Sequence, residues 1–115
     1  MLFVALSKKD ILSINDTKTE AVSVPEWNNA TVYLRTISGL EREAFEESYA
    51  DQKMKNFRLR FLVKTLCDES GARLFEDADI EELGKKSSTV INRLFDKAWS
   101  LNAFTPEAVE KLGEA

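Results

Sequence analysis

The chain has 115 residues, of which 43% are hydrophobic and 31% are charged, and its formal net charge is −4. These values predict one soluble globular domain over residues 1–115 and exclude a disordered tail. The negative net charge argues against nucleic acid as the main partner, because phosphate contacts need clustered positive charge. No apolar stretch is long enough to span a bilayer, so no membrane partner is expected.

The composition also limits the chemistry that the chain can perform. The sequence contains no histidine, which removes the commonest general base and the commonest zinc ligand. Cys67 is the only cysteine, so no internal disulfide can form and a reducing cytoplasm fits the chain. We therefore expect no catalytic residue, no metal and no cofactor.

The N-terminal part predicts a short helix followed by a β-hairpin. Residues 2–6 fit either an extended arm or an edge strand. Ser7 and Asp10 then form a capping box, which predicts the start of a short helix. Apolar residues alternate over 18–24 and again over 30–37, which predicts two antiparallel strands. A lone hairpin is marginal in water, so its apolar face must pack on helices.

The rest of the chain has mainly helical patterns. Ser38 and Glu41 form the clearest capping box and predict a helix with an acidic outer side. Helical spacing of apolar residues predicts four further helices, over 56–67, over 80–83, from Ser87 or Ser88 to Leu101, and after Thr105. Whether the helix over 56–67 continues the one before it is open. These elements predict an α+β fold, mostly helical, in which an N-terminal β-hairpin packs on a small bundle of helices.

The stretch 66–80 breaks one helix and starts the next. Gly71 accepts the backbone angles of a tight turn, and we expect Leu74 and Phe75 to bury after it. The acidic residues of this stretch resemble a calcium loop only weakly, because the glycine is misplaced and Arg73 occupies the sixth position. Metal binding is therefore not expected here.

Paired carboxylates are the residues that most suggest catalysis. They are Glu46 with Glu47, Glu76 with Asp77 and Asp79, and Glu81 with Glu82. Acid catalysis needs one such group buried beside an ionised partner. We favour the simpler interpretation, in which they are solvated helix faces and helix starts. Cys67 has no histidine to activate it and lies beside Leu66 on an apolar face, where cysteine behaves as a small hydrophobe.

A basic band with interleaved phenylalanines occupies residues 53–64. It consists of Lys53, Lys55, Arg58, Arg60 and Lys64, with Phe57 and Phe61 between them. Such a band suits a nucleic-acid surface or an acidic partner. We favour a polar helix side that balances the acidic helix before it, because the overall charge offers no steering field.

Large apolar side chains near loops and near the C-terminus are the candidate contacts for a protein partner. They are Trp27, Trp99, Phe104, Val109 and Leu112. Exposed aromatic residues dominate interface energetics, which favours a partner-binding role. A small domain also needs large residues to fill its core, so the alternative for each is a structural role.

Five segments in a fixed order carry a resemblance to a known family. They are 5–12 (ALSKKDIL), 18–27 (KTEAVSVPEW), 32–46 (VYLRTISGLEREAFE), 66–84 (LCDESGARLFEDADIEELG) and 91–110 (INRLFDKAWSLNAFTPEAVE). This series of capped helix, hairpin, capping-box helix, glycine turn and closing helix resembles the tail assembly chaperone family of long-tailed bacteriophages. The resemblance implies a non-enzymatic phage or prophage protein that binds the tape measure protein and helps to recruit tail tube protein subunits.

The resemblance also implies how such a protein works. It would coat the tape measure protein, a long helical molecule that sets tail length, in the host bacterial cytoplasm. A groove that accepts an amphipathic helix is the physical expectation for such a client. Coating takes many copies, so a homo-oligomer is expected. Many members of the family are made in two lengths by ribosomal frameshifting, and this chain would be the shorter form or the shared N-terminal domain. The alternative is another phage morphogenesis factor, such as a head–tail completion protein.

Overall fold

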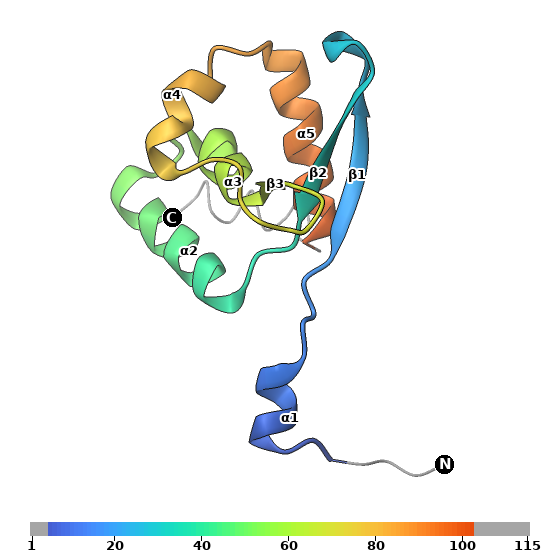
Figure 1. Ribbon diagram of the computed structural model, residues 1–115. Helices are drawn as coiled ribbons and strands as arrows, with labels where there is room; N and C mark the ends of the chain where they lie inside the picture. The colour runs from blue at the N-terminus through green and yellow to red at the C-terminus, as the bar shows by residue number, and fades with distance from the viewer. Residues whose placement is uncertain (1–4, 103–115) are drawn as a thin grey trace.

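The computed structural model describes residues 5–102 and shows a small antiparallel sheet packed against helices (Figure 1). The elements are α1 (Lys8–Ser13), β1 (Thr19–Val24), the 3-10 turn η1 (Pro25–Trp27), β2 (Ala30–Arg35), α2 (Gly39–Gln52), α3 (Phe57–Thr65), β3 (Leu66–Cys67), the 3-10 turn η2 (Asp77–Asp79), α4 (Ile80–Leu83) and α5 (Ser88–Leu101). The fold is α+β and mostly helical, which confirms the predicted class. The helix predicted after Thr105 lies outside the described residues.

The predicted hairpin is present, with β1 and β2 paired antiparallel along their full length. Thr19 pairs with Arg35 at the open end and Val24 with Ala30 near the turn. Asn28 and Asn29 both adopt left-handed backbone angles, with φ of 57° and 58°. Asparagine tolerates this region better than most residues, because its short polar side chain can hydrogen-bond locally. The polar pair therefore suits this turn.

The third strand was not predicted, because the sequence pattern extends the helix over 56–67 through Cys67. In the structure α3 ends at Thr65, and Leu66 with Cys67 pairs antiparallel with Leu34 and Tyr33 of β2. The sheet order is β1-β2-β3. The free edge of β2 supplies backbone partners that an isolated helix end lacks. The helix prediction is therefore wrong for its last two residues.

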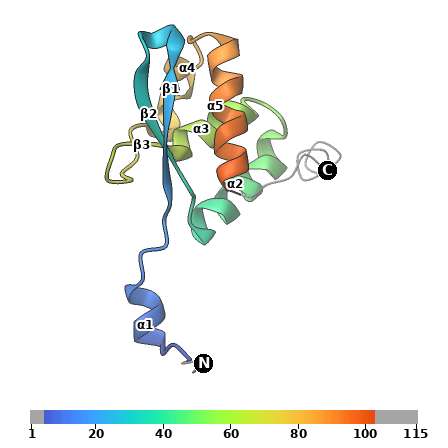
Figure 2. The ribbon, with the colours of Figure 1, turned by 90° about the vertical axis from the view of Figure 1, so that its right-hand side faces the viewer.

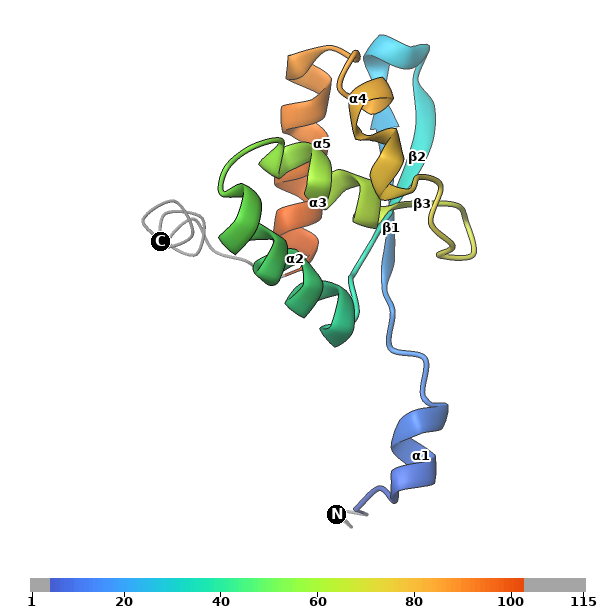
Figure 3. The same ribbon diagram turned by 90° about the vertical axis from the view of Figure 1, so that its left-hand side faces the viewer.

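The core lies between the sheet and the helices α2, α3 and α5, with α3 passing between α2 and α5 (Figures 1 and 3). Val22, Val24 and Leu34 cover it from the sheet. Its centre is a cluster of five rings with centroids 5.0–6.5 Å apart, formed by Phe45, Phe57, Phe61, Phe95 and Trp99. Each such ring pair contributes about 0.5–1.5 kcal/mol beyond the area it buries. This aromatic cluster joins α2 and α3, which follow each other in the chain, to α5, which is distant in sequence.

The connection between α2 and α3 answers a question that the sequence left open. The helices are separate, and Lys53 and Asn56 between them both have a φ of 52°. Arg60 holds this bend from inside: its Nε donates to Lys55 O at 2.8 Å, its Nη1 to Ser48 Oγ at 2.8 Å and its Nη2 to Lys53 O. A buried guanidinium thus supplies the hydrogen bonds that a broken helix loses.

The stretch after β3 turns back on itself through Gly71. This glycine has a φ of +92°, a backbone conformation that residues with a Cβ atom rarely adopt. Asp68 Oδ1 accepts hydrogen bonds from Ser70 N at 2.8 Å and Ala72 N at 3.0 Å, which closes the turn. Phe75 packs against the core as expected, but Leu74 is 54% exposed, so the prediction that it buries is wrong.

Candidate interaction surfaces

Residues 5–18 form an extended N-terminal arm that ends in α1. Figures 1 and 2 show α1 standing away from the sheet and the other helices. The predicted capping box is confirmed: Ser7 Oγ accepts from Asp10 N at 3.1 Å, and Asp10 Oδ2 accepts from Ser7 N at 3.1 Å. These hydrogen bonds also lower the pKa of Asp10. The helix nevertheless has no buried residue, so it is held by local bonds alone.

The arm exposes large apolar side chains of a kind that globular domains usually bury. Leu12 is 74% exposed, and three more large apolar residues of the arm are exposed with it: Leu6, Ile11 and Ile14. Exposed apolar side chains scattered singly are ordinary, but a group on one short segment marks an interaction surface. The arm is therefore the first candidate for contact with another protein.

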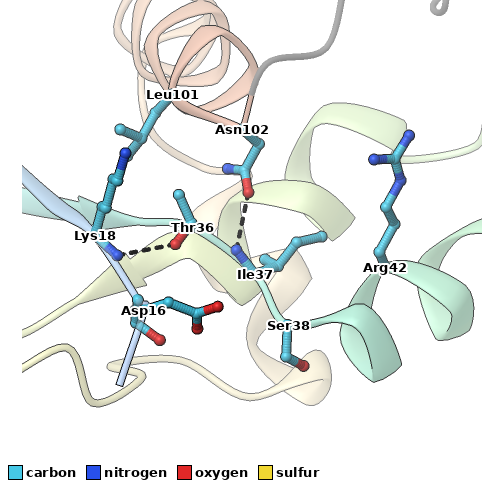
Figure 4. Close-up of a pocket in the computed structure, with 9 residues that line it drawn as sticks. Asp16, Lys18, Thr36, Ile37, Ser38, Arg42, Leu101 and Asn102 are labelled. Carbon is cyan, nitrogen blue, oxygen red and sulfur yellow. Dashed lines mark hydrogen bonds between the residues drawn. The ribbon is translucent and has the colours of Figure 1, made fainter. Parts of the chain in front are cut away.

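The root of the arm is fixed to the body at the end of β2. Thr36 N donates to Lys18 O at 2.9 Å, and Lys18 N donates to Thr36 Oγ1 at 3.0 Å. Asn102 joins the end of α5 to the same place, because its Oδ1 accepts from Ile37 N at 2.8 Å (Figure 4). A cavity of about 320 Å³ lies here, lined by Asp16, Thr17, Lys18, Thr36, Ile37, Ser38, Arg42, Leu101 and Asn102. The two bonds of Lys18 therefore hold the end of the arm beside β2, while α1 stands away from the other elements (Figures 1 and 2).

Trp27 lies in η1, at the end of the hairpin, where the sequence places it. The side chain is half-buried and packs against the core, so part of its ring faces solvent. Glu26 beside it accepts two hydrogen bonds from Arg93 of α5, at 2.8 and 2.5 Å. The hydrogen bonds from Arg93 lower the pKa of Glu26 to about 2. A partner-binding role for Trp27 remains a prediction.

Trp99 is not exposed, so the expectation that it offers a surface contact is wrong. Only 5% of it reaches solvent, and its ring stacks on Phe95 at 5.2 Å and meets Phe61 at 5.0 Å. The sequence pattern places Trp99 at the edge of the apolar stripe of its helix, but α3 covers that edge. Phe104, Val109 and Leu112, the other predicted contacts, lie outside the described residues.

The predicted basic band over 53–64 is divided by the fold. Arg60 turns inward and is 4% exposed, while burial lowers its pKa. Lys64 is also mostly covered and lies 3.7 Å from Asp77. These two cations line a cavity of about 330 Å³ between α2 and η2, whereas Lys53, Lys55 and Arg58 stay exposed. The band is therefore not one continuous surface.

The predicted carboxylates are mostly exposed to solvent, and among them Asp77 lies at the rim of the cavity between α2 and η2. Every one is exposed except Asp79, which is half-buried and accepts a hydrogen bond from Glu76 N at 2.7 Å. Cys67 is 1% exposed, and burial raises the pKa of its thiol. Neither the carboxylates nor the thiol therefore has the surroundings that acid or nucleophilic catalysis needs. Over residues 5–102, no three acidic or cysteine side chains cluster as metal ligands, and no helix could cross a bilayer.

A sequence model described as "phage tail assembly chaperone" matches residues 8–112. The chain belongs to this family. A solved structure, the tail assembly chaperone of bacteriophage HK97, has the same fold with a TM-score of 0.63 and 22% sequence identity. The alignment covers 81% of this chain and 90% of the HK97 chain. No curated protein sequence matches the chain significantly.

The sequence predicts the helix of the arm, but it does not predict that the side chains of the arm are exposed. The capping residues are local, and both Ser7 and Ser38 perform as predicted. The signal for exposure was the polar stretch 15–18, which separates the apolar residues of the arm from the hairpin. Asn102 and Arg60 were also missed as structural clamps, because their partners are far away in sequence or become available only after the chain bends.

Proposed function

We propose that this tail assembly chaperone binds the tape measure protein, helps to recruit tail tube subunits and catalyses no reaction. We also propose that it works as a homo-oligomer in the host bacterial cytoplasm. The observation that carries the proposal is the exposed apolar arm, on a chain that belongs to this family. Apolar groups gathered on a surface favour contact with another protein over chemistry on a small substrate.

A long helical client fits the remaining surface features. An amphipathic helix binds by burying its apolar face against apolar side chains of the receptor. We propose Trp27, whose ring is only half-buried, as one such contact. Phe104, Val109 and Leu112 remain proposed contacts on the C-terminal segment. Trp99 supports the surface from the core instead of touching the client.

Protein, rather than nucleic acid or lipid, is the proposed partner. The net charge of −4 repels phosphate, and the basic band is reduced because Arg60 is buried and Lys64 is mostly covered. A gel shift with duplex DNA at low salt tests this part of the proposal, and retardation at micromolar protein would contradict it.

The proposal is tested by pull-down with overlapping fragments of the tape measure protein from the same phage or prophage. The tagged full chain should retain at least one fragment at micromolar concentrations, and it should also retain tail tube protein. An unrelated coiled-coil protein of similar charge serves as the control prey. If no tape measure fragment is retained, the proposed function is wrong.

A variant of the proposed contact sharpens this test. Trp27→Ala should lower the affinity for the retained fragment by about tenfold or more, because aromatic anchors contribute most of the binding free energy. Leu74→Ala is the matched control, since Leu74 is exposed but lies on the loop after β3. Circular dichroism checks that both variants remain folded. Equal affinities for the two variants would remove Trp27 from the binding surface.

A further inference from the structure

Helix α1 needs a partner to be stable. It has only six residues, and none of them is buried. Isolated helices of this length do not persist in water, because the few hydrogen bonds formed cannot offset the loss of chain entropy. Packing of the exposed side chains Ile11 and Leu12 against another surface would supply the missing stabilisation. Such a surface must cover both side chains.

The charges on the arm indicate which kind of surface can pack against α1. Lys8 and Lys9 form no ion pair with any side chain in residues 5–102, whereas Asp10 is engaged in the capping box. Lys8 lies three and four residues before Ile11 and Leu12, so all three share one face of α1. This face is apolar and positive. A matching surface must be apolar and negative.

Helix α2 carries such a surface on its outer side. Leu40 is 81% exposed, the highest value of any large apolar residue in the described part of the chain. Glu43, Glu47 and Asp51 follow it at intervals of three or four residues, so they continue the same face. All three are exposed, and none forms an ion pair with another residue of 5–102. We call Leu40, Glu43, Glu47 and Asp51 the α2 stripe.

We propose that α1 of one copy of this chain packs on the α2 stripe of a second copy, with Ile11 and Leu12 against Leu40 and the two lysines against the carboxylates. This inference rests on the self-association proposed above and assigns it a surface. Lys18 is held beside Thr36, and α1 stands away from α2 of its own chain, which favours a neighbour over the same chain (Figures 1 and 2). Because each copy has both an arm and an α2 stripe, every copy can place its arm on one neighbour and receive the arm of another.

Charge exchange tests the contact with full-length chains in sedimentation velocity. Lys8→Glu with Lys9→Glu, and separately Glu43→Lys with Glu47→Lys, should each weaken self-association by about tenfold or more, because like charges then face each other. Mixing the two variants should restore association, since the reversed arm meets the reversed stripe. Restoration on mixing identifies a contact between copies, and its absence would overturn the proposal.

Apolar substitution gives a second and independent measurement. Leu12→Ser should weaken self-association by about tenfold or more, whereas Leu74→Ser should leave it unchanged although Leu74 is also exposed. Equal behaviour of these two variants would remove the arm from the interface. High salt should weaken association of the unaltered chain, because the proposed ion pairs lie near the surface.

The same variants separate this inference from the proposed function. If the unaltered chain associates and the arm variants associate equally well, the arm contact is wrong while tape measure binding can still stand. A chain that stays monomeric at every concentration contradicts both the arm contact and the proposed homo-oligomer. If Leu12→Ser loses the tape measure fragment but keeps full self-association, the arm binds the client and not a second copy.

Discussion

The aromatic core and the N-terminal arm contain similar apolar side chains in opposite surroundings. In the core, Phe61 has no exposed surface and its ring meets Trp99 at a centroid distance of 5.0 Å. In the arm, Leu12 is 74% exposed and its helix buries nothing. Apolar content therefore does not by itself assign a segment to the core. The core residues have neighbours on three helices, whereas the arm has neighbours only along its own chain.

Truncating a core side chain should give the largest loss of stability, and truncating an arm side chain should give almost none. Phe61→Ala should lower the free energy of unfolding by about 3–5 kcal/mol, because it leaves a cavity among packed rings. Leu12→Ala, in the arm, should change it by less than about 0.5 kcal/mol, measured on monomer at low concentration. Urea unfolding followed by tryptophan fluorescence measures both. Phe61→Leu offers a milder step if the alanine variant does not fold. A large effect in the arm would mean that α1 already packs on its own body.

Removing the internal guanidinium should have the next largest effect. Arg60→Met should cost about 1–3 kcal/mol, since Ser48 Oγ and the carbonyls of Lys53 and Lys55 lose their donor. Arg58→Met is the matched control, because Arg58 is exposed two positions earlier on α3. Hydrogen exchange should show faster opening of the bend between α2 and α3 in the first variant only. Unchanged exchange would mean that the bend is held by other contacts.

Loosening the arm root should have a smaller effect. Asn102→Ala removes the acceptor for Ile37 N and should cost about 1 kcal/mol. The amide of Ile37 should exchange faster, because its hydrogen bond to the end of α5 is lost. Asn92→Ala, at an exposed site on the same helix, should change neither quantity. Equal exchange of the Ile37 amide in both variants would show that Asn102 does not hold the root.

Lowering the pH should weaken the ion pair between Glu26 and Arg93, and this effect should be the smallest. The pKa of Glu26 is lowered from 4.5 to about 2, chiefly by hydrogen bonds from Arg93. A lowered folded-state pKa stabilises the fold above the unfolded value, and this contribution is lost as pH falls from 4.5 towards 2. The melting temperature of Glu26→Gln should therefore approach that of the unaltered chain over this range. Because the pair is partly exposed, the difference should be small at neutral pH. A constant difference across the range would contradict the link.

Local signals in the sequence were sufficient to predict where several helices begin and where the hairpin lies. Ser7 with Asp10 and Ser38 with Glu41 form the predicted capping boxes, because each box is completed within three residues of chain. The alternation that predicts the hairpin is equally local, and the observed pairing from Thr19 to Arg35 follows it. These features, in their order, also carried the family resemblance that the match over residues 8–112 bears out.

The sequence by itself determined where helices begin, where the hairpin turns and which family the chain resembles. Only the tertiary structure decided which apolar residues are covered: Trp99 is buried because α3 lies over it, and Leu12 is exposed because no element reaches it. The end of α3 was likewise decided by the free edge of β2, which draws Leu66 and Cys67 into the sheet. The physical reason is range, because caps and turns act over a few residues, whereas burial depends on segments that only folding brings together.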